Sequence, residues 1–411
     1  MANVEQVVIG GVDTHKDVHV AAVIDDRGKI LETAEFEASA KGYGQLLDWM
    51  VGLGELARVG VEGTGAYGAG LARHLAAGGL EVVEVNRPNR TMRRRRGKSD
   101  TVDAEAAARA ALNGEASVTP KGEDGIVESI RVLRVAFTSA RNSRTRVALQ
   151  VRDLIITAPD QLRETLGALS TAERVARCAR FDQIGDPAVP LEGTKLALRT
   201  LARRYQSLTE EMAELDAELD ELTVRANPAL RGAKGVGADV AAILLTAAGD
   251  NPERLHSEAA FAAMCGVNPI EASSGKVVRH RLNRSGNRQA NHALWRIVMV
   301  RRTCDPATKA YIARRKAEGK TEREAVRCLK RYVAREVYRL IVDPQRVPVG
   351  ADLRAAREAI GISQRQAAEG MGAAQMAISR LERSLTHDTA LANRYEQWLA
   401  DLTPAQTKKA A

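Results

Sequence analysis

The chain has 411 residues, of which 45% are hydrophobic and 27% charged, and this composition excludes a disordered or a fibrous protein. Lys and Arg exceed Asp and Glu by nine, an excess that favours a polyanionic partner such as nucleic acid. Aromatic residues make up only 3%, which argues against a single-strand-binding surface built from stacked rings.

The length is sufficient for two to four domains. The four cysteines are scattered without CxxC spacing, which indicates reduced thiols and neither a zinc site nor a disulfide frame. The N-terminus lacks the basic start and apolar core of a secretory signal, and no uncharged apolar stretch reaches the roughly 20 residues of a membrane span. We therefore expect a cytoplasmic protein with no membrane contact.

Residues 1–125 alternate between short apolar runs and helical patterns. Strands are expected at 7–14, 18–25, 30–37, 57–62 and 80–86. Helices are expected at 43–51, at 65–77, and after the N-cap Ser99. Three strands followed by alternating helix and strand form an α/β order, compatible with a mixed five-stranded sheet. This order predicts an RNase H-like fold, in which the first strand is central and carries the first catalytic acid.

Four acidic residues form the main candidate site of this domain. Asp100 and Asp103 are three residues apart, so they share one face of the expected helix. Asp13 and Glu62 each lie at the end of an expected strand. Each acid alone could be an ordinary surface residue, but carboxylates are the ligands that Mg²⁺ prefers. The set predicts a pair of Mg²⁺ ions, about 4 Å apart, for phosphoryl transfer on nucleic acid.

Cationic residues lie beside these acids in the sequence. We expect the basic run before Asp100 to bind a phosphate backbone, although it could also be a solvated helix face. The run consists of Arg93, Arg94, Arg95, Arg96 and Lys98. His15 and Lys16 follow Asp13 closely and are expected to line the site without a direct role.

Residues 126–228 are expected to be helical, with long helices over 130–168 and 193–225 and breaks at Pro159 and around 186–190. The second helix carries an apolar stripe of coiled-coil type. Its members are Leu201, Leu208, Met212, Leu215, Leu219 and Leu222. The stripe fits three arrangements: a hairpin packed on its own protein, a coiled coil between protomers, or an arm that carries RNA or DNA.

Residues 229–345 form the next expected domain, which is mainly α-helical. Gly235-Val236-Gly237 before an apolar helix resembles a helix–hairpin–helix turn that contacts phosphate, though a plain tight turn is the alternative. The segment from Cys265 to about Asn287 is loop-like and strongly basic, and an amphipathic helix follows it. Its candidate nucleic-acid contacts are Lys276, Arg279, Arg281 and Arg284.

Residues 346–402 follow a short linker and have the spacing of a Cro/repressor-type helix-turn-helix. Ser363 is the expected N-cap of the first helix, Gly372 lies in the turn, and the recognition helix spans 373–383. The candidate DNA contacts are Gln364, Gln375, Met376 and Arg380. A three-helix adaptor that has lost its DNA contact is the alternative.

Several of these motifs together resemble a known family. GVDTHKD, VEGTGAYG, NRPNR and KSDTVDAEAAA are similar to the RuvC-like DEDD transposases of insertion sequences, the group that includes the Piv-type DNA invertases. GVGADVAAILLTAAGD, FAAMCGVNP, SSGKVVRHR and SGNRQANHALW are similar to the C-terminal domain of that family. The resemblance covers roughly residues 6–345, with both blocks in the family's order and spacing.

The resemblance implies roles for individual residues. Asp13, Glu62, Asp100 and Asp103 match the family's metal-binding tetrad. Ser274 matches a serine that attacks DNA and holds it as a phosphoserine, with Ser273 as the alternative if the register slips by one. A serine is a weak nucleophile unless activated, and a metal ion could supply that activation. The acids and the serine must then meet in space, within one protomer or across two.

The same resemblance implies partners. These are the DNA of the element ends and target, a structured noncoding guide RNA, and further copies of the chain in a dimer or tetramer. The repressor-like tail departs from the family, whose usual chains end soon after the serine domain.

Three functions remain open on the sequence. The first is a DNA transposase or recombinase, and the second is a junction-resolving or RNase H-like nuclease that uses metal-activated water. The third is a noncatalytic DNA-binding regulator, against which the intact set of four acids argues. Ser274 separates the first two, because hydrolysis does not need it.

Overall fold

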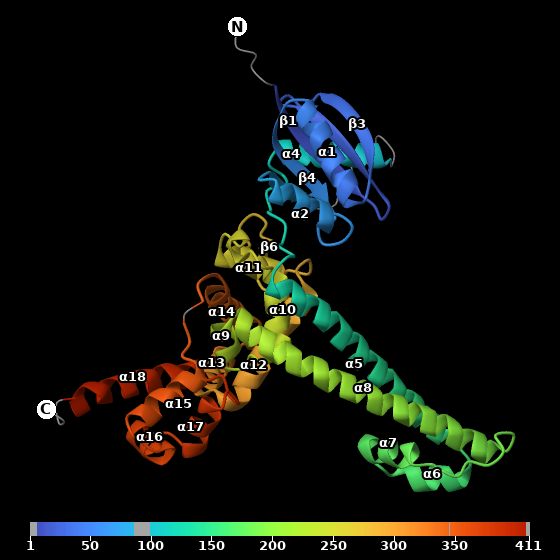
Figure 1. The fold of residues 1–411 in the computed structure, drawn as a ribbon, viewed down its shortest axis with the longest axis vertical. Coiled ribbons are helices and arrows are strands. Elements are labelled where there is room, and N and C mark those ends of the chain that lie inside the picture. Colours follow the sequence, from blue (N-terminus) through green and yellow to red (C-terminus); the bar gives the residue numbers. More distant parts are fainter. Residues whose placement is uncertain (1–5, 86–98, 345, 408–411) are drawn as a thin grey trace. The chain divides into compact units, whose positions relative to one another are not determined.

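The computed structural model describes residues 6–85, 99–344 and 346–407. The basic run Arg93, Arg94, Arg95, Arg96 and Lys98 lies outside the described residues. The chain divides into two compact units, the first of which combines residues 1–125 with 248–256. The second unit combines residues 126–247 with 257–411 (Figure 1). None of the helices in the described ranges is long and apolar enough to cross a membrane.

A mixed five-stranded sheet forms the centre of unit 1. The strands are β1 (Val7–Thr14), β2 (Val18–Asp25), β3 (Ile30–Glu37), β4 (Glu55–Glu62) and β5 (Glu81–Val85). Their order is β3-β2-β1-β4-β5, with β1 antiparallel to β2 and parallel to β4. The mixed sheet and its central first strand are therefore confirmed. The first three strands have the expected bounds, while β4 begins two residues earlier than expected.

Helices cover both faces of this sheet. Side chains alternate between the two faces of a strand, so Val8 and Val12 of β1 pack with α1 (Ala40–Gly52) and α2 (Ala69–Ala77). Ile9 packs on the opposite face, with the alanines of α4 (Asp100–Leu112). The expectation that a helix begins at residue 65 was wrong, because residues 63–68 form successive turns and α2 begins at Ala69.

Two long helices form an arm of unit 2. Figure 1 shows α5 (Ile126–Ile156) and α8 (Pro190–Ala226) running side by side, with α6 (Asp160–Gly167) and α7 (Thr171–Ala179) at one end. The expected break at Pro159 separates α5 from α6, and Pro190 occupies the first turn of α8. Leu201 and Leu208 of the apolar stripe pack in one cluster with Val147 of α5, so part of the stripe is covered by the same chain.

The next part of unit 2 is mainly helical. Its helices are α9 (Pro228–Gly232), α10 (Ala238–Ala248), α11 (Glu258–Met264), α12 (Arg288–Cys304), α13 (Pro306–Ala317) and α14 (Glu322–Val342). Residues 269–282, expected to be a loop, instead form a hairpin of β6 (Pro269–Glu271) and β7 (His280–Leu282). Asn287 caps α12 by accepting hydrogen bonds from the backbone N–H groups of Gln289 and Ala290.

Four further helices complete unit 2. They are α15 (Gly350–Ala359), α16 (Gln364–Met371), α17 (Gln375–Glu382) and α18 (Thr389–Thr407). Ser363 caps α16 in a reciprocal pair with Gln366, and Gly372 ends it in the left-handed conformation. The N-cap and the turn glycine lie where the sequence placed them, while the helix expected over 373–383 spans Gln375–Glu382.

Candidate active site

Asp13 and Glu62 lie at the same edge of the sheet. Asp13 is the penultimate residue of β1, and Glu62 is the last residue of the parallel neighbour β4. In the register of the two strands, Val12 lies opposite Val61. The alternation of side chains places Asp13 on the same face as Ile9, which packs with α4. The hydroxyl of Thr14 donates to the Glu62 carbonyl oxygen at 2.8 Å and ties the two strand ends together.

Two glycines allow α4 to lie directly on this face. A Cβ atom added to Gly11 of β1 would lie 2.1 Å from the Ala108 nitrogen and 2.3 Å from the Ala104 carbonyl oxygen. One added to Gly60 of β4 would lie 2.6 Å from the Ala107 oxygen. Backbone therefore contacts backbone here, which a side chain on either strand would prevent. This close contact holds the first turn of α4 near the end of β1.

The first turn of α4 carries the other two acids. Ser99 caps the helix by accepting a hydrogen bond from the Val102 backbone N–H, so Asp100 and Asp103 both fall in the first turn. Carboxylates are favourable there because the helix N-terminus is the positive end of the helix dipole. Asp103 is buried at 3% exposure, whereas about half of the Asp100 side chain is exposed.

His15 links the end of β1 to α4. Its Nε2 atom lies 3.3 Å from Oδ2 of Asp13 and 3.4 Å from Oδ1 of Asp100. One ligand atom from each of these three residues lies within 4.8 Å of the other two. From its sequence context, His15 was expected to line the site without a direct role. Its position two residues after Asp13, just past the strand end, was the available signal.

The Asp13 carboxyl is buried and lies beside other charged groups. Burial raises its pKa above the ordinary value, and the neighbouring carboxylates Asp103 and Asp100 raise it further. His15 acts in the opposite direction, by its charge and by a hydrogen bond. A cation among these carboxylates would relieve their mutual repulsion. Oxygen donors of this kind suit Mg²⁺ or Mn²⁺, so the donor set fits a divalent metal.

The candidate nucleophile Ser274 belongs to unit 2. It begins the four-residue turn at the tip of the β6–β7 hairpin, where its backbone exchanges two hydrogen bonds with Val277, each 3.1 Å long. Gly275 follows it with a φ of +56°, a conformation that favours glycine. The chain around the turn is exposed, so the tip can approach a large polyanion.

The two serine candidates differ in their hydroxyl groups. The Ser273 oxygen accepts a hydrogen bond from the Arg279 backbone N–H at 3.2 Å and also lies 3.4 Å from the Arg279 carbonyl oxygen. The Ser274 hydroxyl makes no hydrogen bond to any other described residue. Ser274 is therefore the freer of the two for an external partner.

The predicted nucleic-acid contacts are distributed over two regions of unit 2. Lys276, Arg279, Arg281 and Arg284 are all exposed on the hairpin or directly after it. In the C-terminal helices, Gln375 and Arg380 of α17 are exposed. The amide nitrogen of Gln364 instead donates to Glu382 at 2.7 Å within the helical bundle.

Two family models match separate parts of the chain. The model for a DEDD transposase, described as "Transposase", matches residues 10–157. The model described as "Transposase IS116/IS110/IS902 family" matches residues 227–313. The first match includes all four acids, and the second includes Ser274.

Two curated relatives are similar in sequence. One is the insertion element IS110 uncharacterized 43.6 kDa protein of Streptomyces coelicolor, 29% identical over 185 residues, which are 43% of this chain and 45% of the relative. The other is the insertion element IS900 uncharacterized 42 kDa protein of Mycobacterium paratuberculosis, 25% identical over 378 residues, with 79% of this chain and 93% of the relative covered. The match to the first thus spans less than half of its length.

Proposed function

Because the chain carries both domains of the IS110 family of insertion-sequence transposases and belongs to that family, we propose that it cuts and rejoins DNA through a serine nucleophile. The observation that carries the proposal is the cluster of Asp13, His15 and Asp100 at the end of the central strand. Its donor set suits divalent cations. We propose that the site holds a pair of Mg²⁺ ions, with Asp103 and Glu62 as further ligands.

The chemistry assigned to these residues is a transesterification. The Ser274 oxygen forms a bond to a backbone phosphorus while one phosphoester bond to deoxyribose breaks. The serine loses its proton, and the freed sugar oxygen gains one, so atoms and charge balance. Attack of a deoxyribose hydroxyl on the phosphoserine reverses the step and joins a new pair of strands. A bound divalent cation would polarise the phosphate and favour the serine alkoxide.

Further parts of the proposal rest partly on the family relationship and partly on the structure itself. We infer an RNase H-like fold for unit 1 from its central β1 and strand order. A guide RNA, an oligomer that brings the acids and the serine together, and DNA contact by α17 are further parts of the proposal. The exposed side chains of Gln375 and Arg380 support the last of these.

The test is a denaturing gel of the full chain with Mg²⁺ and supercoiled DNA that carries the ends of its own element. The transcript flanking the element is included, because a guide RNA is part of the proposal. A covalent protein–DNA adduct is expected, and it should disappear in both Ser274→Ala and Asp13→Ala.

Two controls sharpen this experiment. Ser273→Ala should retain the adduct, because the Ser273 hydroxyl is held by the Arg279 backbone. Nicking that survives Ser274→Ala but not Asp13→Ala would instead establish the second candidate, a nuclease that uses metal-activated water.

A further inference from the structure

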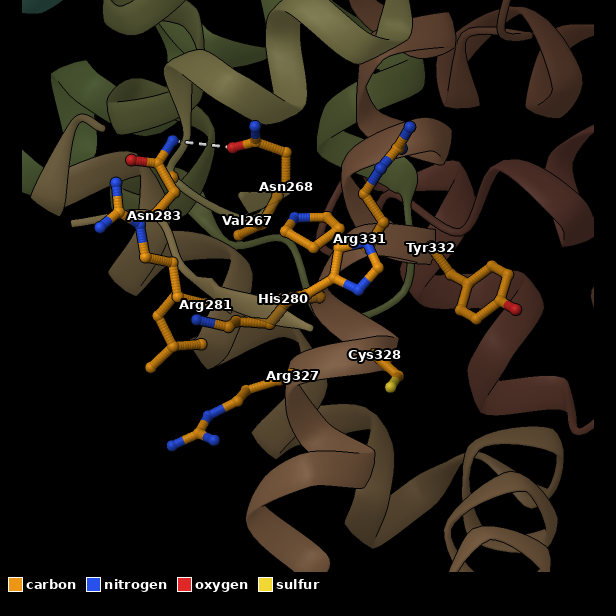
Figure 2. A pocket seen from close by; sticks show the side chains of 13 residues that line it. Val267, Asn268, His280, Arg281, Asn283, Arg327, Cys328, Arg331 and Tyr332 are labelled. Carbon is orange, nitrogen blue, oxygen red and sulfur yellow. Dashed lines mark hydrogen bonds between the residues drawn. The ribbon is translucent and has the colours of Figure 1, made fainter. Parts of the chain in front are cut away.

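A pocket of about 510 Å³ lies beside the β6–β7 hairpin within unit 2. One wall is formed by residues 266–269 and by residues 280–283, which include β7. Residues of α14 between 327 and 332 form the other wall. Figure 2 shows the labelled side chains of both walls around the pocket, together with the 2.7 Å hydrogen bond from Asn283 to Asn268.

The pocket has an excess of positive charge. Arg281 and Arg327 form no ion pair within the part of the chain that the structure describes. The Lys330 ammonium is half-buried, and among the described residues it donates only to the neutral Asn291 Oδ1 atom, at 2.7 Å. Arg331 is the exception, since it is paired with Glu258 at 3.0 Å. None of the described residues that line the pocket is a carboxylate.

This charge is costly without a counterion. Burial lowers the pKa of Lys330, and the nearby charge of Arg327 lowers it further. Two cations that destabilise each other at a pocket wall are stabilised when an anion binds between them. The electrostatics therefore favour an anionic ligand.

The same pocket has apolar surface that a simple anion would leave in water. Val267, Pro269, Leu282 and Tyr332 line it, and about half of each of the last two residues is exposed. The volume lies in the range of roughly 300–1,000 Å³ that is typical of small-molecule sites. A ligand that carries both a phosphate and a flat ring covers both kinds of surface, and a nucleotide has this combination.

The position of the pocket relates it to Ser274. From His280 to Val277, which pairs with Ser274, the hairpin extends by three residues, or about 10 Å. A base-stacked strand rises about 3.4 Å per nucleotide, so for a strand stacked up to the pocket this length corresponds to roughly three nucleotides. A strand whose phosphate lies at Ser274 can thus reach the pocket.

We propose that this pocket holds an unstacked nucleotide of the DNA strand about three positions from the phosphate that Ser274 attacks. Its phosphate contacts Arg281, Arg327 and Lys330, and its base lies against Leu282 and Tyr332. The identity of the strand and its register relative to Ser274 rest on the proposed function, whereas the pocket and its charge do not depend on the reaction. Such a site fixes the register of the strand, as base-extruding enzymes do.

The first experiment uses the full chain carrying Ser274→Ala, so that binding is measured without reaction. Single-stranded DNA from the element end carries 5-iodouracil at successive positions, and irradiation cross-links it to a neighbouring aromatic ring. A cross-link to Tyr332 at one or two adjacent positions is expected, mapped by mass spectrometry. Absence of any cross-link to Tyr332 would overturn the proposal.

The second experiment measures the dependence of binding on salt. Loss of one phosphate contact should reduce the slope of log K against log salt by about 0.7 for single-stranded DNA. Arg327→Ala should show this reduction and a weaker Tyr332 cross-link. Arg339→Ala is the matched control, because Arg339 is an exposed arginine of α14 that does not line the pocket. Equal slopes in the two variants would contradict the proposal.

Two further outcomes separate the possible errors. If RNA of the same sequence cross-links to Tyr332 and DNA does not, the pocket binds the wrong strand for this proposal, which then fails. If the cross-link is present but the chain that retains Ser274 forms no DNA adduct, the proposed function fails while the pocket assignment stands.

Discussion

Asp13 shows how a single residue acquires its environment. The alternation of side chains directs it toward α4, and its penultimate place in β1 brings it to His15 and Asp100. Neighbouring carboxylates and burial both disfavour its charge, so the site gains most from a cation at this position. The same reasoning explains why His15 belongs to the site, although its sequence context alone gave it a minor role.

At this scale we predict that Asp13→Asn weakens the binding of Mn²⁺ to the full chain at least tenfold, because a buried ligand oxygen loses its charge. Isothermal titration calorimetry measures the effect. Asp17→Asn is the control, since Asp17 is exposed four residues further on and is not in the cluster. Equal Mn²⁺ affinity in both variants would remove Asp13 from the metal site.

At the scale of elements, the contact between β1 and α4 positions the candidate site. Gly11 and Gly60 leave no side chain between the strands and the helix, and the alanines of α4 fill the remaining space. The sequence pattern indicated each of these elements separately, and Ser99 marked the start of α4. It did not indicate that two glycines allow them to touch.

We predict that Gly11→Ala displaces α4 from the sheet, because the added Cβ would overlap backbone atoms that cannot move independently. Both thermal stability and Mn²⁺ affinity should fall, the former by several degrees. Gly44→Ala is the control: Gly44 lies in α1 and an added Cβ meets nothing within 4 Å. Its melting temperature should be unchanged or slightly higher, because alanine favours a helix. A stable Gly11→Ala variant with full Mn²⁺ affinity would refute this account.

At the scale of the whole molecule, the C-terminal helices form a part with its own core. The helices from α15 to α18 share an apolar core and a buried network in which Glu382 accepts hydrogen bonds from Arg357, Gln364 and Tyr395. These hydrogen bonds and the charge of Arg357 hold the pKa of Glu382 below its ordinary value, although burial acts in the opposite direction. A group whose pKa is lowered by folding stabilises the folded state when it is ionised.

We predict that Glu382→Gln loosens this helical bundle by about 3 kcal/mol while the sheet of unit 1 keeps its stability, since Arg357 loses its buried counterion and is left with the half-exposed Glu358. Hydrogen exchange of the full chain measures both parts at once. The stabilisation by Glu382 is present above the unfolded pKa of about 4.5 and is lost as the pH falls through the lower folded value. The variant should lack this component of the acid sensitivity, and Glu369→Gln, at an exposed position, should retain it.

Features that depend on residues close together in the chain could be predicted from the amino-acid pattern. The first three strands, the caps Ser99 and Ser363, and the turn glycine Gly372 follow from residue alternation and local hydrogen bonds. The start of α2 and the β6–β7 hairpin were not predicted, because glycine-rich and basic segments carry little periodicity. Long-range packing, in contrast, brings Asp13 and His15 to Asp100 and lets α4 lie directly on the sheet at Gly11 and Gly60. The physical reason is that such distances depend on the packing of segments far apart in the sequence, where one glycine determines how closely a helix approaches a strand.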